Sequence, residues 1–174
     1  MSGGHYSERM PEEAAVRAFA SILEREGLHA ALAYLNSRTP HRCTAIYRYD
    51  GEVMRNVLLY DRMDPQARHG IDVALADAYC GQVAARGNHF EFSDTRLLPA
   101  SQQCPHNPVV CYCGVVIPGP AGAAWGTLCH YDFKPCQMRK SDIPLLQAVV
   151  HLVHEHAARD LAQAMGPGLS PASP

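Results

Sequence analysis

The residues of this 174-residue chain with the most reactive side chains are its 7 cysteines and 10 histidines. Four of the cysteines gather in two neighbouring segments, CYCG at 111–114 and AAWGTLCHYDFKPC at 123–136. Such thiols can ligate a metal, take part in redox exchange, or fill a core as small apolar groups. The odd number of cysteines, in a chain that we expect to be cytoplasmic, favours reduced thiols over a framework of disulfides.

The spacing of Cys111 and Cys113 bears on metal binding. Two residues apart on a strand, their Cα atoms lie about 6.6 Å apart with parallel side chains. Zinc-binding pairs normally use a turn that lets the two sulfurs converge. We therefore expect no metal site, and we interpret Cys43, Cys111 and Cys129 as buried small apolar side chains.

Three helices are expected to frame the domain. Apolar residues repeat at helical spacing over 11–26, over 28–38 and over 143–165, and Ser141-Asp142 precedes the last of these segments. Between the helices, the apolar period changes to that of strands. We predict a hairpin over 43–60, a strand over 71–75, a helix over 77–86, a strand over 90–94, and a second hairpin over 109–132. This order predicts an α+β domain with a central, largely antiparallel sheet.

The second hairpin turns at PGPAG, and centring it on Pro120 predicts the cross-strand partners. Cys111 then faces Cys129, and Cys113 faces Thr127. Both faces of this hairpin are mainly apolar, so we expect it in the middle of the sheet with a covering layer on each side. A shift of one residue would exchange Tyr112 and Leu128 for Cys113 and Thr127 on a given face.

Composition limits the class of protein. Hydrophobic residues make up 47% and charged residues 18%, which is typical of one globular domain. The net charge of −2 provides no basic patch, so we expect no nucleic-acid partner. No apolar run approaches the ~20 residues needed to span a bilayer, and the N-terminus is too polar and acidic for a signal peptide. We therefore expect a soluble, cytoplasmic protein without a membrane partner, with a flexible N-terminus (1–10), one domain (11–165) and a disordered tail (166–174).

Three stretches of the sequence resemble GAF domains, the small sensory domains of signalling proteins. They are AYCGQVAARGNHFEFSDTR, then HNPVVCYCGVVIPGPAGAAWGTLCHYD, and then the final helix. The resemblance covers about residues 10 to 162. It implies that the terminal helices pack on one face of the sheet. It also implies a ligand pocket, covered by a helix and loops, on the other face, and a homodimer formed through the first and last helices.

The resemblance also implies where the ligand-binding residues lie, and we expect Asp94 and Arg96 to supply polar contacts. The full set of candidates is Tyr79, Cys80, Phe92, Asp94, Arg96, Tyr112, Cys113, Trp125, Thr127 and Cys129. The family does not fix the ligand or any cofactor, which stay unknown. The residues that bind cyclic nucleotides in some GAF domains are absent, and the match to bilin-binding members is poor. His130, Tyr131 and Lys134-Pro135-Cys136 depart from the pattern of commoner relatives.

Three functions remain open from the sequence. The first is a stand-alone sensory domain that binds a small molecule and signals through a dimer or a partner protein. The second is a thiol-dependent reductase resembling the free methionine sulfoxide reductase branch of GAF proteins, with Cys80 and Cys104 as catalytic residues. This branch keeps carboxylates beside and after its cysteine, whereas here Pro105 follows Cys104. The third is a protein that holds haem or another redox cofactor through His106 or His130 and a nearby cysteine.

Overall fold

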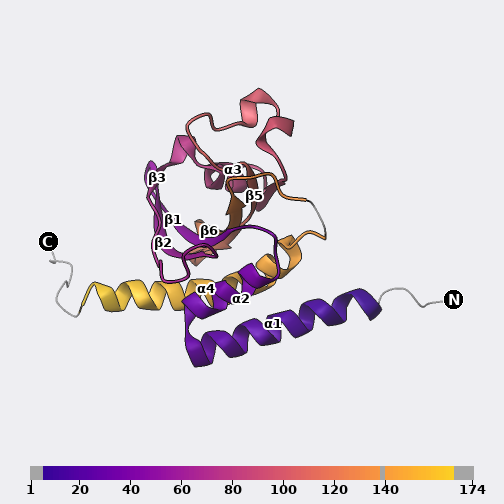
Figure 1. The fold of residues 1–174 in the computed structure, drawn as a ribbon. Helices are drawn as coiled ribbons and strands as arrows, with labels where there is room; N and C mark the ends of the chain where they lie inside the picture. Colours follow the sequence, from indigo (N-terminus) through magenta and orange to yellow (C-terminus); the bar gives the residue numbers. More distant parts are fainter. Residues whose placement is uncertain (1–5, 138–139, 167–174) are drawn as a thin grey trace, which may run out of the picture.

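The computed structural model describes residues 6–137 and 140–166. It is an α+β domain built from one antiparallel sheet and four helices (Figure 1). The elements in chain order are α1 (Tyr6–Glu26), α2 (Leu28–Ser37), β1 (Cys43–Asp50), β2 (Val53–Asp61), β3 (Val73–Ala74), α3 (Tyr79–Ala85), β4 (His89–Phe92), β5 (Cys111–Pro118), β6 (Ala124–Asp132) and α4 (Ile143–Ala164). Four 3-10 turns, η1 (Leu75–Asp77), η2 (Thr95–Leu97), η3 (Ala100–Gln102) and η4 (Pro120–Gly122), connect them.

The six strands lie in the order β3-β2-β1-β6-β5-β4, and every neighbouring pair is antiparallel. The hairpin of β5 and β6 therefore occupies interior positions of the sheet, as the apolar character of both its faces predicted. The first hairpin turns after Asp50 at Gly51, whose φ of 61° lies in the left-handed region that glycine tolerates. The predicted α+β class with a central antiparallel sheet is confirmed.

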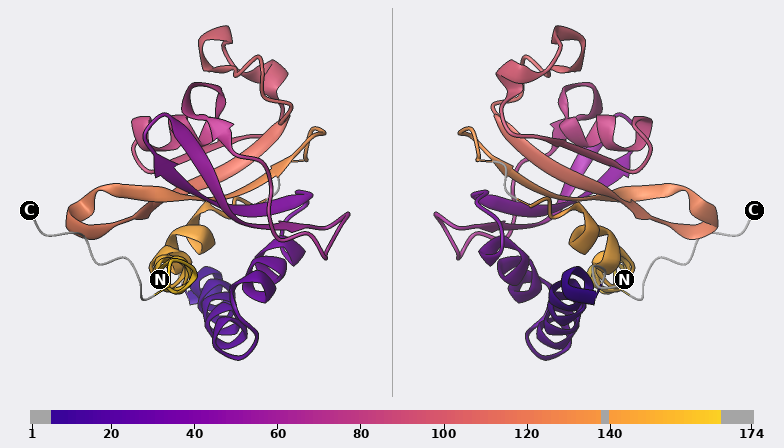
Figure 2. Two further views of the ribbon diagram at one scale, coloured as in Figure 1. Left: turned by 90° about the vertical axis from the view of Figure 1, so that its left-hand side faces the viewer. Right: turned by 90° about the vertical axis from the view of Figure 1, so that its right-hand side faces the viewer.

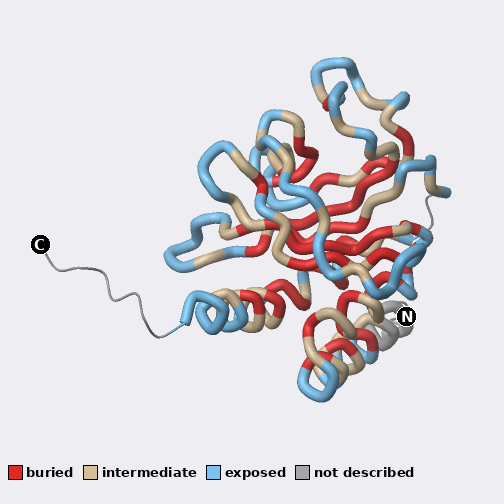
Figure 3. The backbone as a smooth tube through the Cα atoms, turned by 60° about the vertical axis from the view of Figure 1, so that its left-hand side comes forward, coloured by how far each residue is buried: buried red, intermediate tan, exposed pale blue. Residues whose placement is uncertain are grey.

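Two separate cores lie on the two faces of the sheet. Helices α1, α2 and α4 pack beneath one face, while α3 and the segment after β4 cover the other (Figure 2). The central strands are buried along most of their length because both faces are covered (Figure 3). Alternate residues of a strand point to opposite faces, so neighbouring residues of β5 belong to different cores.

The register of the β5–β6 hairpin differs from the prediction. Cys113 pairs with His130, not with Thr127, and Gly114 pairs with Cys129. The shift is an odd number of residues, so it also changes which side chains share a face. Cys113 belongs to the core beneath the helices, whereas Cys129 belongs to the core on the α3 side.

The turn of this hairpin explains the error. A 3-10 turn over Pro120–Gly122 and a bulge between Ile117 and Pro118 replace the symmetric turn that the prediction assumed. Ala121 and Gly122 adopt φ values of 58° and 77°, in the left-handed region. The chain therefore reverses direction through this turn rather than through a symmetric hairpin loop. The pairing beyond the bulge follows from this local geometry.

The ends of the domain also differ in part from the prediction. Helix α1 begins at Tyr6, before the predicted start at residue 11. The predicted flexible segment and tail fall partly on residues 1–5 and 167–174, which lie outside the described residues. Among the helices that the structure describes, none combines the length and the apolar character needed to cross a membrane.

Candidate functional site

A cavity of about 330 Å³ lies between α3 and the face of the sheet that the terminal helices leave open. This volume is within the range of small-molecule sites in proteins, roughly 300–1,000 Å³. Its lining combines tyrosines from three strands with the start of α3 and two loops. The lining residues are Tyr47, Met54, Ile71, Asp72, Val73, Ala74, Asp77, Ala78, Tyr79, Cys80, His106, Asn107, Pro108, Val109, Tyr112, Cys129, Tyr131 and Phe133.

Aromatic rings packed against one another form the inner wall. Tyr79 meets Phe92 edge-on at 4.7 Å between ring centroids, and Phe92 stacks on Tyr112 at 6.0 Å. Phe90 completes the cluster. Such pairs contribute about 0.5–1.5 kcal/mol each beyond the area they bury. The wall is therefore held in place by its own packing before any ligand enters.

Tyr112 reaches the cavity because the residue two positions further along β5 is Gly114. The phenol ring lies over this glycine, and a Cβ at that position would overlap the ring and its hydroxyl. The Tyr112 hydroxyl then donates a hydrogen bond to Cys80 Sγ at 3.3 Å. At the start of α3, the Tyr49 hydroxyl also donates a hydrogen bond to the Cys80 carbonyl at 2.8 Å.

Cys80 and Cys129 form a buried thiol pair in the floor of the cavity. A hydrogen bond from Cys129 is the largest effect on the Cys80 thiol, and it lowers the pKa below the ordinary value in spite of burial. The pKa of Cys129 is raised well above its ordinary value by the same hydrogen bond and by burial. The hydrogen bond between the two thiols therefore favours ionisation of one of them and disfavours ionisation of both.

The hydroxyl of Thr127 supports the same thiolate. Thr127 is fully buried beside the pair, and among the described residues no conventional hydrogen bond engages its Oγ1. Its hydroxyl and that of Tyr112 both stabilise ionised Cys80 and so contribute to the lowered pKa. An ionised Cys80 gives this otherwise unpartnered hydroxyl an acceptor.

The structure brings many of the predicted site residues together at this cavity. Tyr79, Cys80, Tyr112 and Cys129 line it directly. Phe92 and Thr127, which are also buried, lie behind that lining: Phe92 packs on the wall, and Thr127 supports Cys80. Their part in ligand binding stays a prediction.

Two predicted residues lie on the opposite face of the sheet. Cys113 packs in the core beneath the terminal helices. Trp125 packs against the same core, where its ring meets His154 of α4 edge-on at 5.3 Å. Neither residue lines the cavity: Cys113 alternates with the cavity-lining Tyr112 along β5, and the bulge opposite Ile117 and Pro118 places Trp125 on the helix side.

Asp94 and Arg96 form a local structure rather than a wall of the cavity. Asp94 caps η2 by accepting the Arg96 backbone N–H at 2.9 Å, and the two side chains form an ion pair at 2.6 Å. The Arg96 guanidinium holds the pKa of the Asp94 carboxyl below its ordinary value. Neither residue lines the cavity, and their part in ligand binding stays a prediction.

Sequence reasoning missed most of the rim. Tyr47 and Tyr131 lie on β1 and β6, and Asp72, Asp77 and His106 come from connecting segments. The alternation of tyrosines in β1 was the available signal for the strand residues. For the loop residues, no local pattern indicates that they meet, because the fold alone brings their segments together.

The two rim carboxylates differ in their partners. Asp72 accepts hydrogen bonds from the Arg55 side chain at 3.0 Å and from the Asn56 backbone at 2.8 Å. Among residues 6–137 and 140–166, no hydrogen bond or ion pair engages the Asp77 carboxylate, which is half-buried at the cavity. Asp77 is therefore the acidic group with most capacity to contact a ligand.

Cys104 lies in the same apolar core as Cys80, on the α3 side of the sheet. Its Sγ accepts a hydrogen bond from the Gln82 amide at 3.6 Å, and its backbone N–H donates to the Tyr79 hydroxyl at 3.2 Å. Burial raises the pKa of the Cys104 thiol. Of the two cysteines predicted to react, Cys80 is the one whose environment favours the thiolate.

Comparison with known proteins places the fold. The sequence matches no model of a protein family and no curated protein. Among solved structures, it is similar to the GAF domain of an Acinetobacter phosphoenolpyruvate-protein phosphotransferase, with a TM-score of 0.68, 13% identity, and coverage of 95% of this chain and 99% of that one. It is also similar to the free methionine-R-sulfoxide reductase of Neisseria meningitidis in complex with its substrate, with a TM-score of 0.65, 14% identity, and coverage of 92% of this chain and 98% of that one.

A third similar structure is the phycocyanobilin-bound GAF domain of a cyanobacterial phytochrome, with a TM-score of 0.61, 10% identity, and coverage of 98% of this chain and 100% of that one. At these identities the likeness concerns the backbone arrangement and not the chemistry of the site. The chain therefore has the fold of a GAF domain, as the resemblance of its sequence predicted.

Proposed function

We propose that this protein is a sensory domain that binds a small planar molecule in the cavity between α3 and the sheet. The observation that carries the proposal is the cavity itself, about 330 Å³ in volume and walled by tyrosines on the face away from the terminal helices. A mostly apolar, concave site with a few polar groups is the usual form of a ligand pocket. The bound structure of the phytochrome GAF domain supports ligand binding by this fold.

The charges of the lining favour a neutral or cationic ligand. Asp72 and Asp77 lie at the rim, and the described residues that line the cavity include no lysine or arginine. Aromatic faces attract cations, and carboxylates add to that attraction. An anionic ligand would instead approach the Asp77 carboxylate, which no described residue pairs, and an Asp72 carboxylate already paired with Arg55, which is unfavourable.

The signal is proposed to pass through a homodimer or to a partner protein. Helices α1 and α4 pack side by side on the far face of the sheet, and a shallow groove between them is lined by Val16 and Ala148. A second copy packed on this groove would connect the ligand-binding sheet to a neighbour through β5 and α4, which are in direct contact.

A thermal-shift comparison of matched ligands tests the proposal. Aromatic amines are expected to raise the melting temperature, whereas aromatic carboxylates of the same size are not. A ligand at 100 times its dissociation constant stabilises the folded state by about 2.7 kcal/mol. Ala74→Trp at the cavity wall should abolish the shift, while Ala123→Trp at the distant hairpin turn should leave it intact. A flat response to a broad panel of neutral and cationic aromatics would contradict the proposal.

A thiol-dependent reductase is the second candidate, and the Cys80 thiolate favours it. In such a reaction the thiolate attacks the sulfoxide sulfur and Cys104 resolves the intermediate. The two thiols lose two electrons as a disulfide, and the sulfoxide oxygen leaves as water. The Neisseria enzyme supplies the analogy. An NADPH-coupled thioredoxin assay on free methionine sulfoxide decides it, since absence of turnover removes the candidate.

A further inference from the structure

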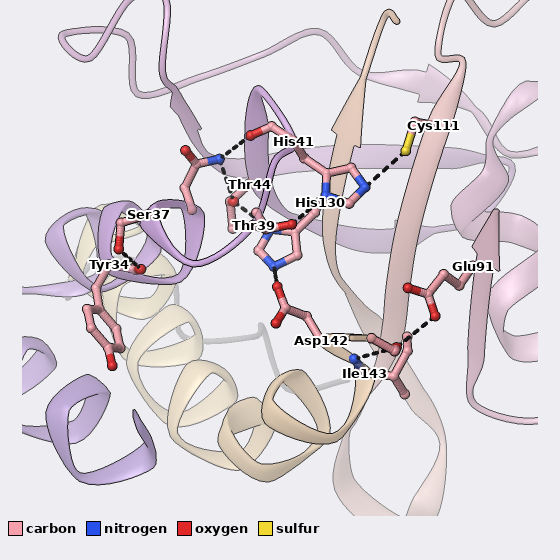
Figure 4. Close-up of polar contacts among 12 residues, drawn as sticks. Tyr34, Ser37, Thr39, His41, Thr44, Glu91, Cys111, His130, Asp142 and Ile143 are labelled. Atoms are coloured by element: carbon pink, nitrogen blue, oxygen red, sulfur yellow. Dashed lines mark hydrogen bonds and ion pairs between the residues drawn. The ribbon is translucent and has the colours of Figure 1, made fainter. Parts of the chain in front are cut away.

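Three potential metal ligands converge at the end of the sheet nearest the start of β1. His41, Cys111 and Cys136 each offer one ligand atom, and all three atoms lie within 4.8 Å of one another. The distance between His41 Nε2 and Cys111 Sγ is 3.2 Å (Figure 4). Around a tetrahedral zinc ion, sulfur and nitrogen ligands are separated by about 3.5–3.8 Å, given metal–ligand bonds of about 2.0–2.3 Å. The three atoms are thus close to the required spacing.

Three separate segments hold these ligands. His41 precedes β1, Cys111 opens β5, and Cys136 follows β6. The Cys136 backbone N–H donates to the Ser93 carbonyl at 3.1 Å, which fixes its loop beside the end of β4. Ligands held by the backbone before metal arrives need little rearrangement to bind it.

His41 is already oriented as a ligand. Its Nδ1 lies 2.6 Å from the Thr39 hydroxyl, which leaves Nε2 directed at Cys111 (Figure 4). A partner on the second ring nitrogen is the usual means of fixing the orientation of a metal-binding histidine. The ring also stacks on His130 at 5.5 Å.

We propose that His41, Cys111 and Cys136 form a binding site for one zinc ion. Two thiolates and one imidazole suit a borderline-soft cation with tetrahedral preference. This site lies on the face of the sheet opposite the tyrosine-walled cavity, because Cys111 alternates with Tyr112 along β5. It is therefore independent of the proposed function.

A second cavity reaches two of the three ligands. His41 and Cys136 line this cavity of about 530 Å³, which provides a path for entry of the ion. Asp132 also lines it, but its carboxylate accepts backbone hydrogen bonds from Arg42, Phe133 and Lys134 at 2.7–3.2 Å. The carboxylate is thereby held in the loop, so water or a small anion completes the coordination.

Cobalt provides the direct test, because thiolate-bound Co²⁺ gives a charge-transfer band in the near ultraviolet. The full chain is stripped with a chelator, kept reduced with a phosphine, and titrated with Co²⁺ and then with Zn²⁺ against a competing zinc indicator. We expect one equivalent per chain, a thiolate band, and displacement of Co²⁺ by Zn²⁺. Cys136→Ser, in a half-buried loop, should weaken zinc binding by at least ~100-fold.

Cys104→Ser is the matched control, since it removes a buried thiol far from the three ligands and should bind zinc like the parent. Circular dichroism before and after chelation shows that each variant is folded. Absence of the thiolate band in the reduced parent would overturn the proposal. So would equal affinity in the parent and Cys136→Ser, or a Cys111–Cys136 disulfide that mass spectrometry finds to persist under the reducing conditions.

Discussion

The change Tyr112→Phe tests the electrostatics of the thiol pair directly. It removes one hydroxyl and keeps the ring, so the packing against Phe92 is preserved. The lost group is the donor to Cys80 Sγ at 3.3 Å. Hydrogen bonds to charged groups contribute about 1.5–3 kcal/mol, and one pKa unit corresponds to about 1.4 kcal/mol. The hydroxyl stabilises the thiolate, so its removal should raise the pKa of Cys80 by roughly 1–2 units.

The measurement is the rate of alkylation of Cys80 as a function of pH. The native protein is exposed to iodoacetamide for short times, and mass spectrometry of the Cys80 peptide gives the rate at each pH. Only the thiolate reacts, so the midpoint of the profile reports the apparent pKa of the pair. In the parent this midpoint should lie below the ordinary value of a thiol, because the pKa of Cys80 is lowered.

Tyr79→Phe is the control for this experiment. It removes a hydroxyl from the same wall, but that hydroxyl accepts from the Cys104 backbone and does not donate to Cys80. Its profile should match that of the parent. If the midpoint for Tyr112→Phe also matches, or if Cys111 is alkylated before Cys80, the account of the thiol pair is refuted.

Four further outcomes are expected. Thr127→Val should raise the pKa of Cys80 in the same assay, because one of the groups that stabilise the thiolate is lost. It should also raise the free energy of unfolding in urea by about 1 kcal/mol, because a buried hydroxyl without a conventional partner is removed; any decrease in that free energy would contradict the reasoning. Asp61→Asn should cost about 1 kcal/mol at pH 7, since Arg42 lowers the pKa of Asp61. The difference should decline as pH falls below ~4, where unfolded Asp61 is protonated, and should vanish once the folded carboxylate is protonated too; a difference that does not decline with pH would have another cause. Phe19→Ala, at a fully buried position of α1, should lower the unfolding free energy by about 3–5 kcal/mol; under 1 kcal/mol would mean that α1 is not docked. Light scattering is expected to find a dimer for the parent and a monomer for Ala148→Glu with an unchanged melting temperature; a parent that stays monomeric removes the proposed dimer.

Local signals in the sequence predicted the elements well. The turn at Asp50-Gly51 indicated the first hairpin, formed by β1 and β2. The apolar faces of the second hairpin, formed by β5 and β6, indicated its interior position in the sheet. The register of the second hairpin depended instead on the backbone of one turn. A bulge beside Pro118 placed Trp125 on the helix side, and no pattern within the strands reports such a bulge. Cys113 lies on that side because it alternates with Tyr112 along β5.

The candidate metal ligands show a different limit. Spacing along one strand was the appropriate test for Cys111 with Cys113, and it excluded that pair. It had no bearing on His41, which is 70 residues away from Cys111 in sequence and in contact with it in space. The departure of Cys136 from the GAF pattern was the one local sign that this loop has its own chemistry. Convergence of distant segments is a property of the fold.

Side chains along β5 point alternately to the two faces of the sheet, and this alternation limits where residues can be inserted or deleted. Adjacent residues Cys111 and Tyr112 serve opposite sides of the sheet, one at each candidate site. Inserting or deleting one residue within the strand would turn both side chains over together and dismantle both sites at once. The exposed turn at Pro120–Gly122 has no such constraint. Natural variation in the length of this hairpin should therefore accumulate at its tip, while β5, which begins at Cys111, keeps a fixed number of residues.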